Sequence, residues 1–350
     1  MNKKFKVPYN YLPYEFKSNN QIFKEWKKLI KSTEFTLGPY IEKFEKLFSK
    51  YINTKYSFAT NNGTDALILS LRALNIGKGD EVITVTNSFY ATAGAIVAVG
   101  AKPVFIDCDD RYQIDTSLIE NSITKKTKLI IPVHWGGASP NMRKIMQIAK
   151  KNKIDVIEDA CMGIGGKIFN KSPGTFGKIN AFSMHPLKSL NVMGDGGVVS
   201  TNNKNIADWI KKYRNHGMVD RDHIDFWGVN VRMQPLQAIV AIEGLKKINQ
   251  IIKIRNRNAK ILDSGLKKNH PNIVIPGRVP ENLETFSLYM ILCKKRDQLK
   301  NYLIKKGIEV KIHYPIPLHL QKASKNLNYK KGNLPVSEYQ ANHLITLPVH

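Results

Sequence analysis

Lys188 lies at the centre of a stretch, Asn180–Asn202, whose residue types can present an amine to a ligand. Apolar runs at 181–184 and 198–199 are typical of strands, and the proline, asparagine and glycines between them favour a tight loop. An unprotonated lysine amine is a nucleophile that attacks carbonyl carbons. The alternative is a solvated lysine, because Lys is mostly exposed in proteins and this chain has 54 Lys and Arg.

Three other places carry residues suited to ligand binding. Asn61–Thr64 is a glycine-containing turn that opens a helical pattern, and the free N–H groups of a helix start bind anions. Phe89 and Asp159 follow the apolar runs 81–85 and 156–157, at the strand ends where open α/β sheets bind ligands. The alternatives are an ordinary helix cap, a core aromatic and a strand-end cap.

The chain from residue 81 alternates short apolar runs with helical patterns. This alternation predicts crossover units, and therefore a mainly parallel sheet with helices on both faces. Strands are expected at 81–85, 103–107, 129–133 and 156–157, and helices at 91–99 and 141–151.

Segments on either side of this region have different patterns. An extended arm with several prolines precedes two amphipathic helices, with Ile22 and Leu29 on the apolar face of the first and Phe44 and Leu47 on that of the second. A long basic helix is expected at 245–266, and we place a domain boundary at its start. The remainder predicts a small α+β unit, with strands at 272–275, 287–293 and 309–313 and a helix at 297–306.

Composition excludes several classes of protein. A chain of 350 residues with 42% hydrophobic residues can bury a full core. No apolar run approaches the ~20 residues that cross a bilayer, and the start lacks the apolar core of a signal peptide, so we expect a cytoplasmic protein without a membrane partner. Cys108, Cys161 and Cys293 have no paired spacing, which predicts neither disulfides nor a metal site. The net charge of +26 is spread evenly, which favours small anionic substrates over nucleic acid.

The stretch around Lys188 resembles the lysine segment of the DegT/DnrJ/EryC1/StrS sugar aminotransferases, which use pyridoxal 5′-phosphate (PLP). Ser183, the pair His185–Pro186, Lys188 and the turn Gly194–Gly197 match that segment, and the resemblance extends from about Phe35 to His350. It implies a fold-type-I α/β architecture: a large PLP-binding domain (1–244, including the arm) with a mainly parallel, seven-stranded type of sheet, and a small α+β C-terminal domain (245–350).

The resemblance also implies roles for single residues. Lys188 matches the lysine that forms a Schiff base with PLP, and Asp159 matches the carboxylate that pairs with the pyridine nitrogen and keeps it protonated. Phe89 matches the aromatic residue that stacks on the ring. The cofactor-binding residues expected in this way are Gly63, Thr64, Asp65, Phe89, Asp159, Ser183, Lys188 and Asn230, and the substrate-binding residues are His185, Arg232, Tyr314 and His319.

The function implied is transfer of an amino group from an amino acid, glutamate by family analogy or glutamine in some branches, to a keto group of a nucleotide-linked deoxysugar. Asn230 matches an asparagine that reaches the neighbouring site, which implies a homodimer with shared active sites. A free eight-carbon ketoacid sugar as acceptor, a PLP-dependent sugar dehydratase and a non-catalytic regulator are the alternatives. Dehydratases of this kind replace the lysine with histidine.

Two departures from the family pattern stand out. Many relatives have glutamine three residues after the aspartate, where this chain has Met162, so the contact to the ring hydroxyl is in question. Family members generally continue beyond the position of TLPVH with a further helix, so we expect a C-terminal domain shortened at its end. The sequence leaves open the sugar, the carbon that is aminated and its stereochemistry.

Overall fold

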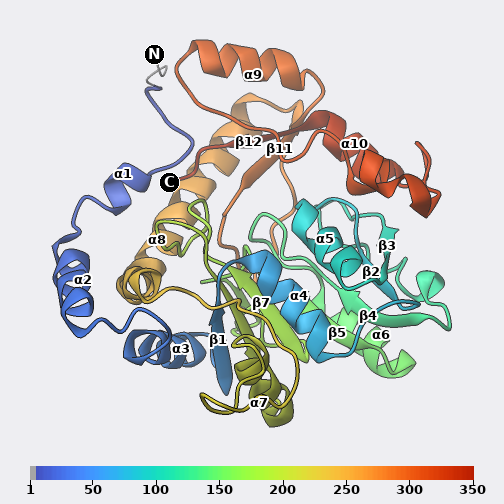
Figure 1. The fold of residues 1–350 in the computed structure, drawn as a ribbon. Coiled ribbons are helices and arrows are strands. Elements are labelled where there is room, and N and C mark those ends of the chain that lie inside the picture. Colours follow the sequence, from blue (N-terminus) through green and yellow to red (C-terminus); the bar gives the residue numbers. More distant parts are fainter. Residues whose placement is uncertain (1–4) are drawn as a thin grey trace.

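The computed structural model describes residues 5–350, and the first four residues of the expected arm lie outside this range. A seven-stranded sheet forms the centre of the molecule, and only β8 runs against its neighbours (Figure 1). The expected mainly parallel α/β sheet is therefore confirmed. In spatial order its strands are β1 (Tyr56–Thr60), β8 (Gly197–Thr201), β7 (Ile179–Ser183), β5 (Asp155–Asp159), β4 (Thr127–Ile131), β2 (Glu81–Val85) and β3 (Lys102–Ile106).

Helices cover both faces of this sheet because alternate strand residues point to opposite faces. Leu129 and Ile131 of β4 pack with α4 (Gly63–Ala73), α5 (Tyr90–Ala98) and α7 (Lys204–Tyr213). Ile130, between them in the sequence, packs with α6 (Met142–Asn152) on the other face. At the β1 side, α3 (Pro39–Ile52) and α8 (Pro235–Asn269) cover that second face. Within the described residues, no helix has the length and apolar character needed to span a bilayer.

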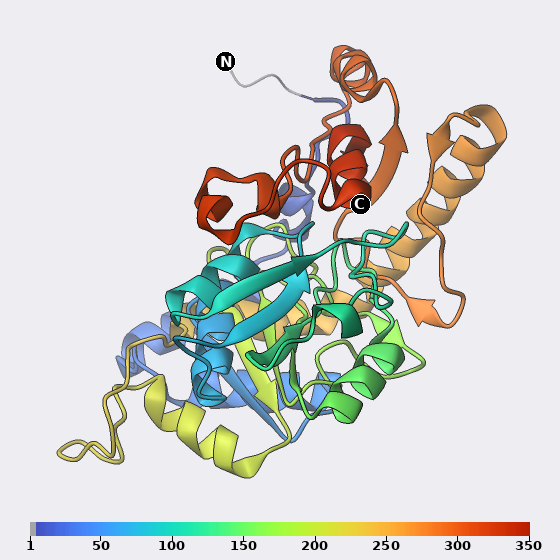
Figure 2. The same ribbon diagram turned by 90° about the vertical axis from the view of Figure 1, so that its right-hand side faces the viewer.

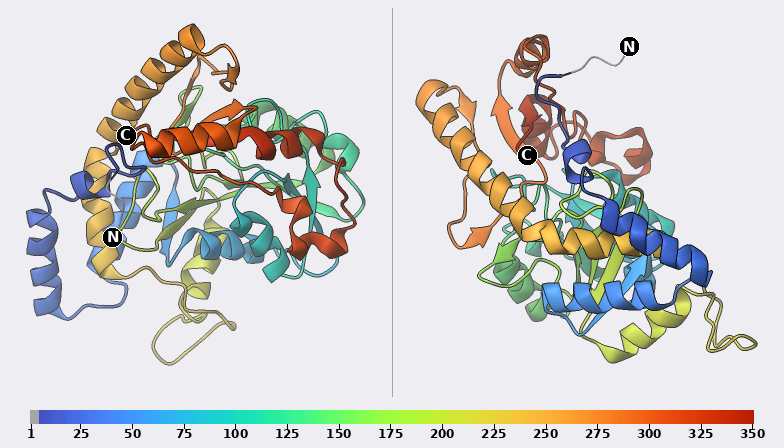
Figure 3. Two further views of the ribbon diagram at one scale, coloured as in Figure 1. Left: turned by 90° about the horizontal axis from the view of Figure 1, so that it is seen from above. Right: turned by 90° about the vertical axis from the view of Figure 1, so that its left-hand side faces the viewer.

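The N-terminal segment follows the outside of this body. α1 (Leu12–Glu15) leads into α2 (Asn20–Ser32), and α2 and α3 lie beside α8 (Figure 3). Ile22 and Leu29 of α2 are buried, as expected, and so is Phe44 of α3. Leu47 was expected on the buried side of α3 but is 38% exposed, and part of the apolar surface here therefore faces solvent.

The long helix α8 begins at Pro235, whereas the sequence pattern predicted a start at 245. Its first half packs in the core with β7 and β8, and its second half, from Ala259, packs against the small C-terminal sheet. That sheet consists of β12 (Leu344–Leu347), β11 (Tyr289–Cys293) and β9 (Ile273–Val274), in this order. A continuous helix therefore joins the two cores, and the predicted boundary at 244 falls inside it.

The C-terminal unit differs from the expected one in its third strand. Residues 309–313 form no regular strand; Ile308 bridges to Val7 of the arm and Lys311 to Thr346 of β12. The strand role is taken by β12, so the arm and the last residues of the chain both pack on this unit. The remaining elements are β6 (Lys167–Ile168), β10 (Asn282–Leu283), α9 (Arg296–Lys305), α10 (Pro335–His343) and the short 3₁₀ helices η1 (Glu120–Ser122), η2 (Leu318–Leu320) and η3 (Lys322–Leu327).

Phe182 of β7 provides a test of this packing, because its ring is fully buried. It contacts the ring of Phe48 of α3 edge to face, with the ring centroids 5.1 Å apart. Phe182→Ala removes these contacts and leaves a cavity, so we expect a loss of about 3–5 kcal/mol in the free energy of unfolding, measured by denaturant titration. Leu47→Ala on the exposed side of α3 is the control, with a change of about 0.5 kcal/mol or less. Equal effects of the two substitutions would contradict the packing described.

Candidate active site

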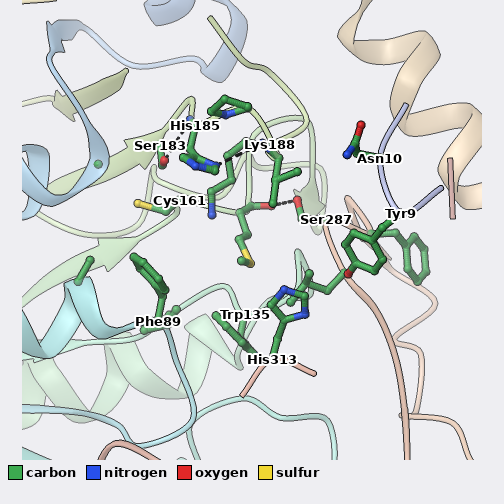
Figure 4. A pocket seen from close by; sticks show the side chains of 18 of the residues that line it. Tyr9, Asn10, Phe89, Trp135, Cys161, Ser183, His185, Lys188, Ser287 and His313 are labelled. Atoms are coloured by element: carbon green, nitrogen blue, oxygen red, sulfur yellow. Dashed lines mark hydrogen bonds between the residues drawn. The ribbon is translucent and has the colours of Figure 1, made fainter. Parts of the chain in front are cut away.

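A cavity of about 340 Å³ lies at the carboxyl edge of the central sheet. Its walls come from the segments that follow β1, β2, β4, β5 and β7, from the arm and from the C-terminal unit. Figure 4 shows Lys188 beside Cys161, with Phe89 and Trp135 on a second wall and Tyr9 on the side of the arm. Of the residues expected to bind cofactor or substrate, the cavity is lined by Gly63, Thr64, Phe89, Asp159, Ser183, His185, Lys188 and Tyr314.

Lys188 enters the cavity from the turn between β7 and β8. The turn is closed by its own backbone, because the N–H of Lys188 donates to the carbonyl of His185 at 2.8 Å. The hydroxyl of Ser183 accepts the N–H of His185 at 3.3 Å, which ties the turn to the end of β7. Burial lowers the pKa of the Lys188 amine, and the nearby Cys161 and Asp159 oppose the shift only in part. A lowered pKa increases the fraction of nucleophilic amine.

Asp159 ends β5 and is 4% exposed. One carboxylate oxygen accepts the hydroxyl proton of Thr92 at 2.7 Å, and the other accepts the N–H of Cys161 at 3.2 Å. Both donors are neutral. Within residues 5–350 no ion pair forms at this carboxylate, so it can take a cationic N–H of a ligand in the cavity.

The start of α4 forms the anion-binding side of the cavity. The side chain of Asn62 caps the helix by accepting a hydrogen bond from the N–H of Asp65 at 2.8 Å. Gly63 and Thr64 lie in the first turn, where backbone N–H groups have no acceptors within the helix. A Cβ atom at Gly63 would lie 2.8 Å from Cβ of Ser183. Glycine at position 63 therefore lets the helix begin in close contact with the end of β7. The peptide dipoles of the helix favour an anion at this N-terminus.

An aromatic wall faces the lysine turn. Phe89 and Trp135 each contact Tyr314, with ring centroids 6.0 and 5.8 Å apart. The indole N–H of Trp135 is buried and has no hydrogen-bond partner within the described residues. Such a wall offers planes for stacking on a flat ring and one donor for a polar ligand group.

Three histidines line the cavity, His185, His313 and His350, and of these only His185 had been predicted as a site residue. The pKa values of the first two are shifted. Burial lowers the pKa of His185, with a further contribution from Lys188. His313, which precedes Tyr314, has its pKa lowered to about 4, first by burial and then by the charges of Lys311 and Lys188. Both rings are therefore neutral near pH 7 and can donate or accept a hydrogen bond.

Four expected site residues do not line this cavity. The side chain of Asp65 accepts from Asn62 at 2.9 Å and so completes the helix cap. His319 is 2% exposed, and its ring nitrogens contact Thr86 and Glu338 at 2.8 and 3.1 Å, outside the cavity, so we do not retain it as a substrate-binding residue. The guanidinium of Arg232 bonds to Asn230 and Asn215 at 3.0 and 2.7 Å, on the exposed segment before α8.

Several residues reach the cavity without having been predicted. Asn62 was not among the single residues given a role but lies in the turn 61–64 expected to bind an anion, and His313 directly precedes a predicted residue, so the sequence held a signal for both. The others come from segments that only the folded chain brings together, and Met162 lies among them, its sulfur accepting the N–H of Gly136 at 3.3 Å. The polar and aromatic residues among these others include Tyr9, Asn10, Tyr11, Trp135, Cys161, Arg255 and Ser287.

Curated relatives cover almost the whole chain. A "Pleiotropic regulatory protein" from Geobacillus stearothermophilus is 36% identical, over 94% of this chain and 89% of its own length. UDP-2-acetamido-2-deoxy-3-oxo-D-glucuronate aminotransferase from Pseudomonas aeruginosa is 34% identical, over 93% and 89%. The 3-oxo-glucose-6-phosphate:glutamate aminotransferase from Bacillus subtilis is 34% identical, over 84% and 68%.

Solved structures match just as widely. DesV from S. venezuelae, solved in complex with a ketimine intermediate, superposes with a TM-score of 0.95 at 31% identity, over 98% of this chain and 93% of its own. NtdA from Bacillus subtilis, solved with bound cofactor PMP, superposes with a TM-score of 0.87 at 30% identity, over 99% of this chain and 83% of its own. The fold, which superposes on these solved aminotransferases, and the amine and carboxylate in one cavity at the edge of its sheet are those of a fold-type-I aminotransferase.

The model of the DegT/DnrJ/EryC1/StrS aminotransferase family matches residues 17–350, and the chain belongs to this family. The expected family, fold class and enzyme class are therefore confirmed. PLP as the expected cofactor agrees with the PMP held by the Bacillus subtilis structure.

The cavity fits PLP on its own geometry. The α4 start and Gly63 provide a place for a phosphate, and the Lys188 amine reaches the same space from β7. Asp159 has no cationic partner among residues 5–350, and Phe89 provides a ring for stacking. Met162 takes no part as a hydrogen-bond donor, because a thioether only accepts, so the ring hydroxyl has no side-chain donor at this position.

The lowered pKa of Lys188 predicts a pH-dependent stability of the cofactor-free protein. The unfolded chain binds more protons than the folded one between the folded pKa and the ordinary pKa of 10.5, so the contribution of Lys188 to stability rises with pH in that window. Lys188→Met should therefore be more stable than the wild type at pH 7, with an advantage that shrinks toward pH 10. Thermal unfolding across this range measures it. Lys211→Met, on the exposed side of α7, is the control; a pH-independent gain for Lys188→Met would contradict the shift.

Proposed function

We propose that this protein transfers an amino group from glutamate to a keto group on a nucleotide-linked sugar, with PLP as cofactor. The observation that carries the proposal is the placement of the Lys188 amine and the Asp159 carboxylate in one cavity with the α4 start. PLP, when bound, supplies an aldehyde for the amine and a ring that accepts the electron pair of the substrate Cα–H bond.

Each of these cavity residues has a separate role in the proposed reaction. Lys188 would hold the cofactor through its amine, and the same amine, when free, would move a proton at the substrate carbon. Asp159 holds a proton at the ring nitrogen, and Thr92 and the Cys161 N–H fix the direction of its carboxylate. Phe89 fixes the plane of the ring, and the α4 start with Ser183 binds the phosphate.

The names of the relatives support the two substrates. One relative acts on a UDP-linked 3-oxo sugar, and another is a glutamate-dependent aminotransferase of a 3-oxo sugar phosphate. Neutral polar groups at His185, His313 and Trp135 suit sugar hydroxyls. The relative named as a regulator supports the alternative without catalysis, but the retained lysine favours transfer of an amino group over both regulation and dehydration.

A direct assay of the proposed reaction uses glutamate, PLP and a panel of nucleotide-linked keto sugars and free keto sugars, with the aminated product followed by mass spectrometry. Lys188→Ala should lose turnover by at least about 10³-fold, because both the covalent anchor and the proton carrier are gone. The unchanged cavity walls should still bind PLP. Retained turnover would contradict the role of Lys188, and a wild type that transfers nitrogen to none of the sugars would favour the regulator.

We also propose a homodimer with shared active sites, in which Asn230 and Arg232 reach the partner's cavity. Both residues are outside the cavity of their own chain and lie at the base of the loop between α7 and α8, where Asn230 bridges to Asn215 and Arg232 to Thr60. The rest of this loop extends away from the body (Figure 2). Trp227 in the same segment is 87% exposed, and Phe23 and Ile30 of α2 are also exposed. Apolar side chains in these positions suit contact with a second copy.

Mixing two inactive variants tests the shared sites. Lys188→Ala and the double variant Asn230→Ala/Arg232→Ala should each be poorly active, because one lacks the amine and the other lacks the residues given to its partner. Unfolded and refolded together, they form mixed dimers with one intact site, and about a quarter of the wild-type rate per site should return. Light scattering confirms the dimer. No recovery in mixed dimers would contradict the exchange of these residues.

A further inference from the structure

Arg255 is a buried cation at the cavity for which the proposed reaction has no use so far. It lies on α8, is 5% exposed and lines the cavity. Its charged group is taken out of water, and burial of a charge costs free energy unless the charge is paired.

The partners of Arg255 within residues 5–350 are all neutral oxygens. The guanidinium donates to the hydroxyl of Ser189 at 3.2 Å, to the carbonyl of Phe286 at 3.4 Å and to the hydroxyl of Tyr11 at 2.9 Å. Its Nε–H is buried and has no acceptor in the described part of the chain. A guanidinium has more N–H donors than these bonds use, so the group is held in place but is not neutralised.

The acidic side chain of Glu15, which the charge of Arg255 affects, does not fill this role. Glu15 of α1 bonds to the amide of Asn191 at 2.9 Å and forms no ion pair with Arg255 in the described part of the chain. The pKa of Glu15 is raised by burial, and the charge of Arg255 opposes that rise. The two charges therefore act on each other through space, and the guanidinium keeps its capacity for an anion from the cavity.

The position of Arg255 indicates which of the anionic groups in the two substrates it binds. Its partner Ser189 is the residue next to Lys188, and consecutive Cα atoms are about 3.8 Å apart. The carboxylate of an amino acid lies one bond from the carbon that bears the amine, so it stays close to Lys188. The diphosphate of a nucleotide-linked sugar lies several bonds from the reacting carbon and suits a more distant site.

We propose that Arg255 binds the α-carboxylate of the amino donor, with Tyr11 of the arm and Ser189 holding the guanidinium in position. This inference rests on the proposed function and adds the residue that recognises the donor. A carboxylate on the guanidinium gives charge-assisted hydrogen bonds in a cavity sheltered from water. It also gives the N-terminal arm a part in the site, because Tyr11 belongs to it.

The experiment compares holoenzyme variants in the two half-reactions separately. Arg255→Gln removes the charge, Arg255→Lys keeps the charge without the fork geometry, and Arg257→Gln makes the same charge change on the exposed side of α8. Glutamate concentration is varied while cofactor absorbance is followed, and the aminated enzyme is then mixed with the keto sugar. Calorimetry with glutarate, a dicarboxylate without an amine, measures binding without turnover, and thermal unfolding measures folding.

Arg255→Gln should weaken glutamate and glutarate binding by roughly 10- to 100-fold, the loss expected for hydrogen bonds to a charged group. Arg255→Lys should recover part of it, Arg257→Gln should match the wild type, and the keto sugar half-reaction should not change. Unchanged glutarate affinity in a folded Arg255→Gln protein, or an effect on the sugar half-reaction alone, would overturn the inference. A wild type that binds glutarate but reacts with no amino acid would instead contradict the proposed function.

Discussion

The partial burial of Lys188 in the cavity is the constraint on which the site depends. A lysine amine in solvent is protonated and inert, whereas a buried one has a lowered pKa and regains its nucleophilic lone pair. Burial of this side chain costs free energy, and three features of the fold offset the cost. They are the turn closed by its own backbone hydrogen bond, its attachment to the end of β7 and the carboxylate of Asp159 in the same cavity. The same arrangement suits a cofactor that presents an aldehyde on one side and a ring nitrogen on the other.

The sequence predicted the part of this arrangement that follows from strand ends. Phe89, Asp159 and Lys188 each lie at or a few residues past the end of a short apolar run, and parallel strands deliver their carboxyl ends to one edge of a sheet. The resemblance to a family then gave these positions their roles. The local sequence pattern and the fold agree here because the central strands are buried on both faces. Burial of this kind fixes how neighbouring strands pair in the sheet.

Other parts depend on contacts between distant segments, which no local pattern contains. His319 lies in the same loop as Tyr314, yet it turns inward to Thr86 and Glu338, and only the packing of η2 on β2 decides that. Arg255 looks in the sequence like any of the lysines and arginines around it on α8, and the burial of its side of the helix against the rest of the fold distinguishes it from Arg257. The long helix likewise continues across the predicted boundary, because its two halves pack on different cores.

The central claim is that one amine, that of Lys188, holds the cofactor. The most direct test is to add PLP to the protein, reduce it with borohydride, digest it and locate the modified lysine by mass spectrometry. The account predicts that one equivalent of pyridoxyl label per chain is found on the peptide that contains Lys188. Label spread over surface lysines, or concentrated on another lysine, would contradict it.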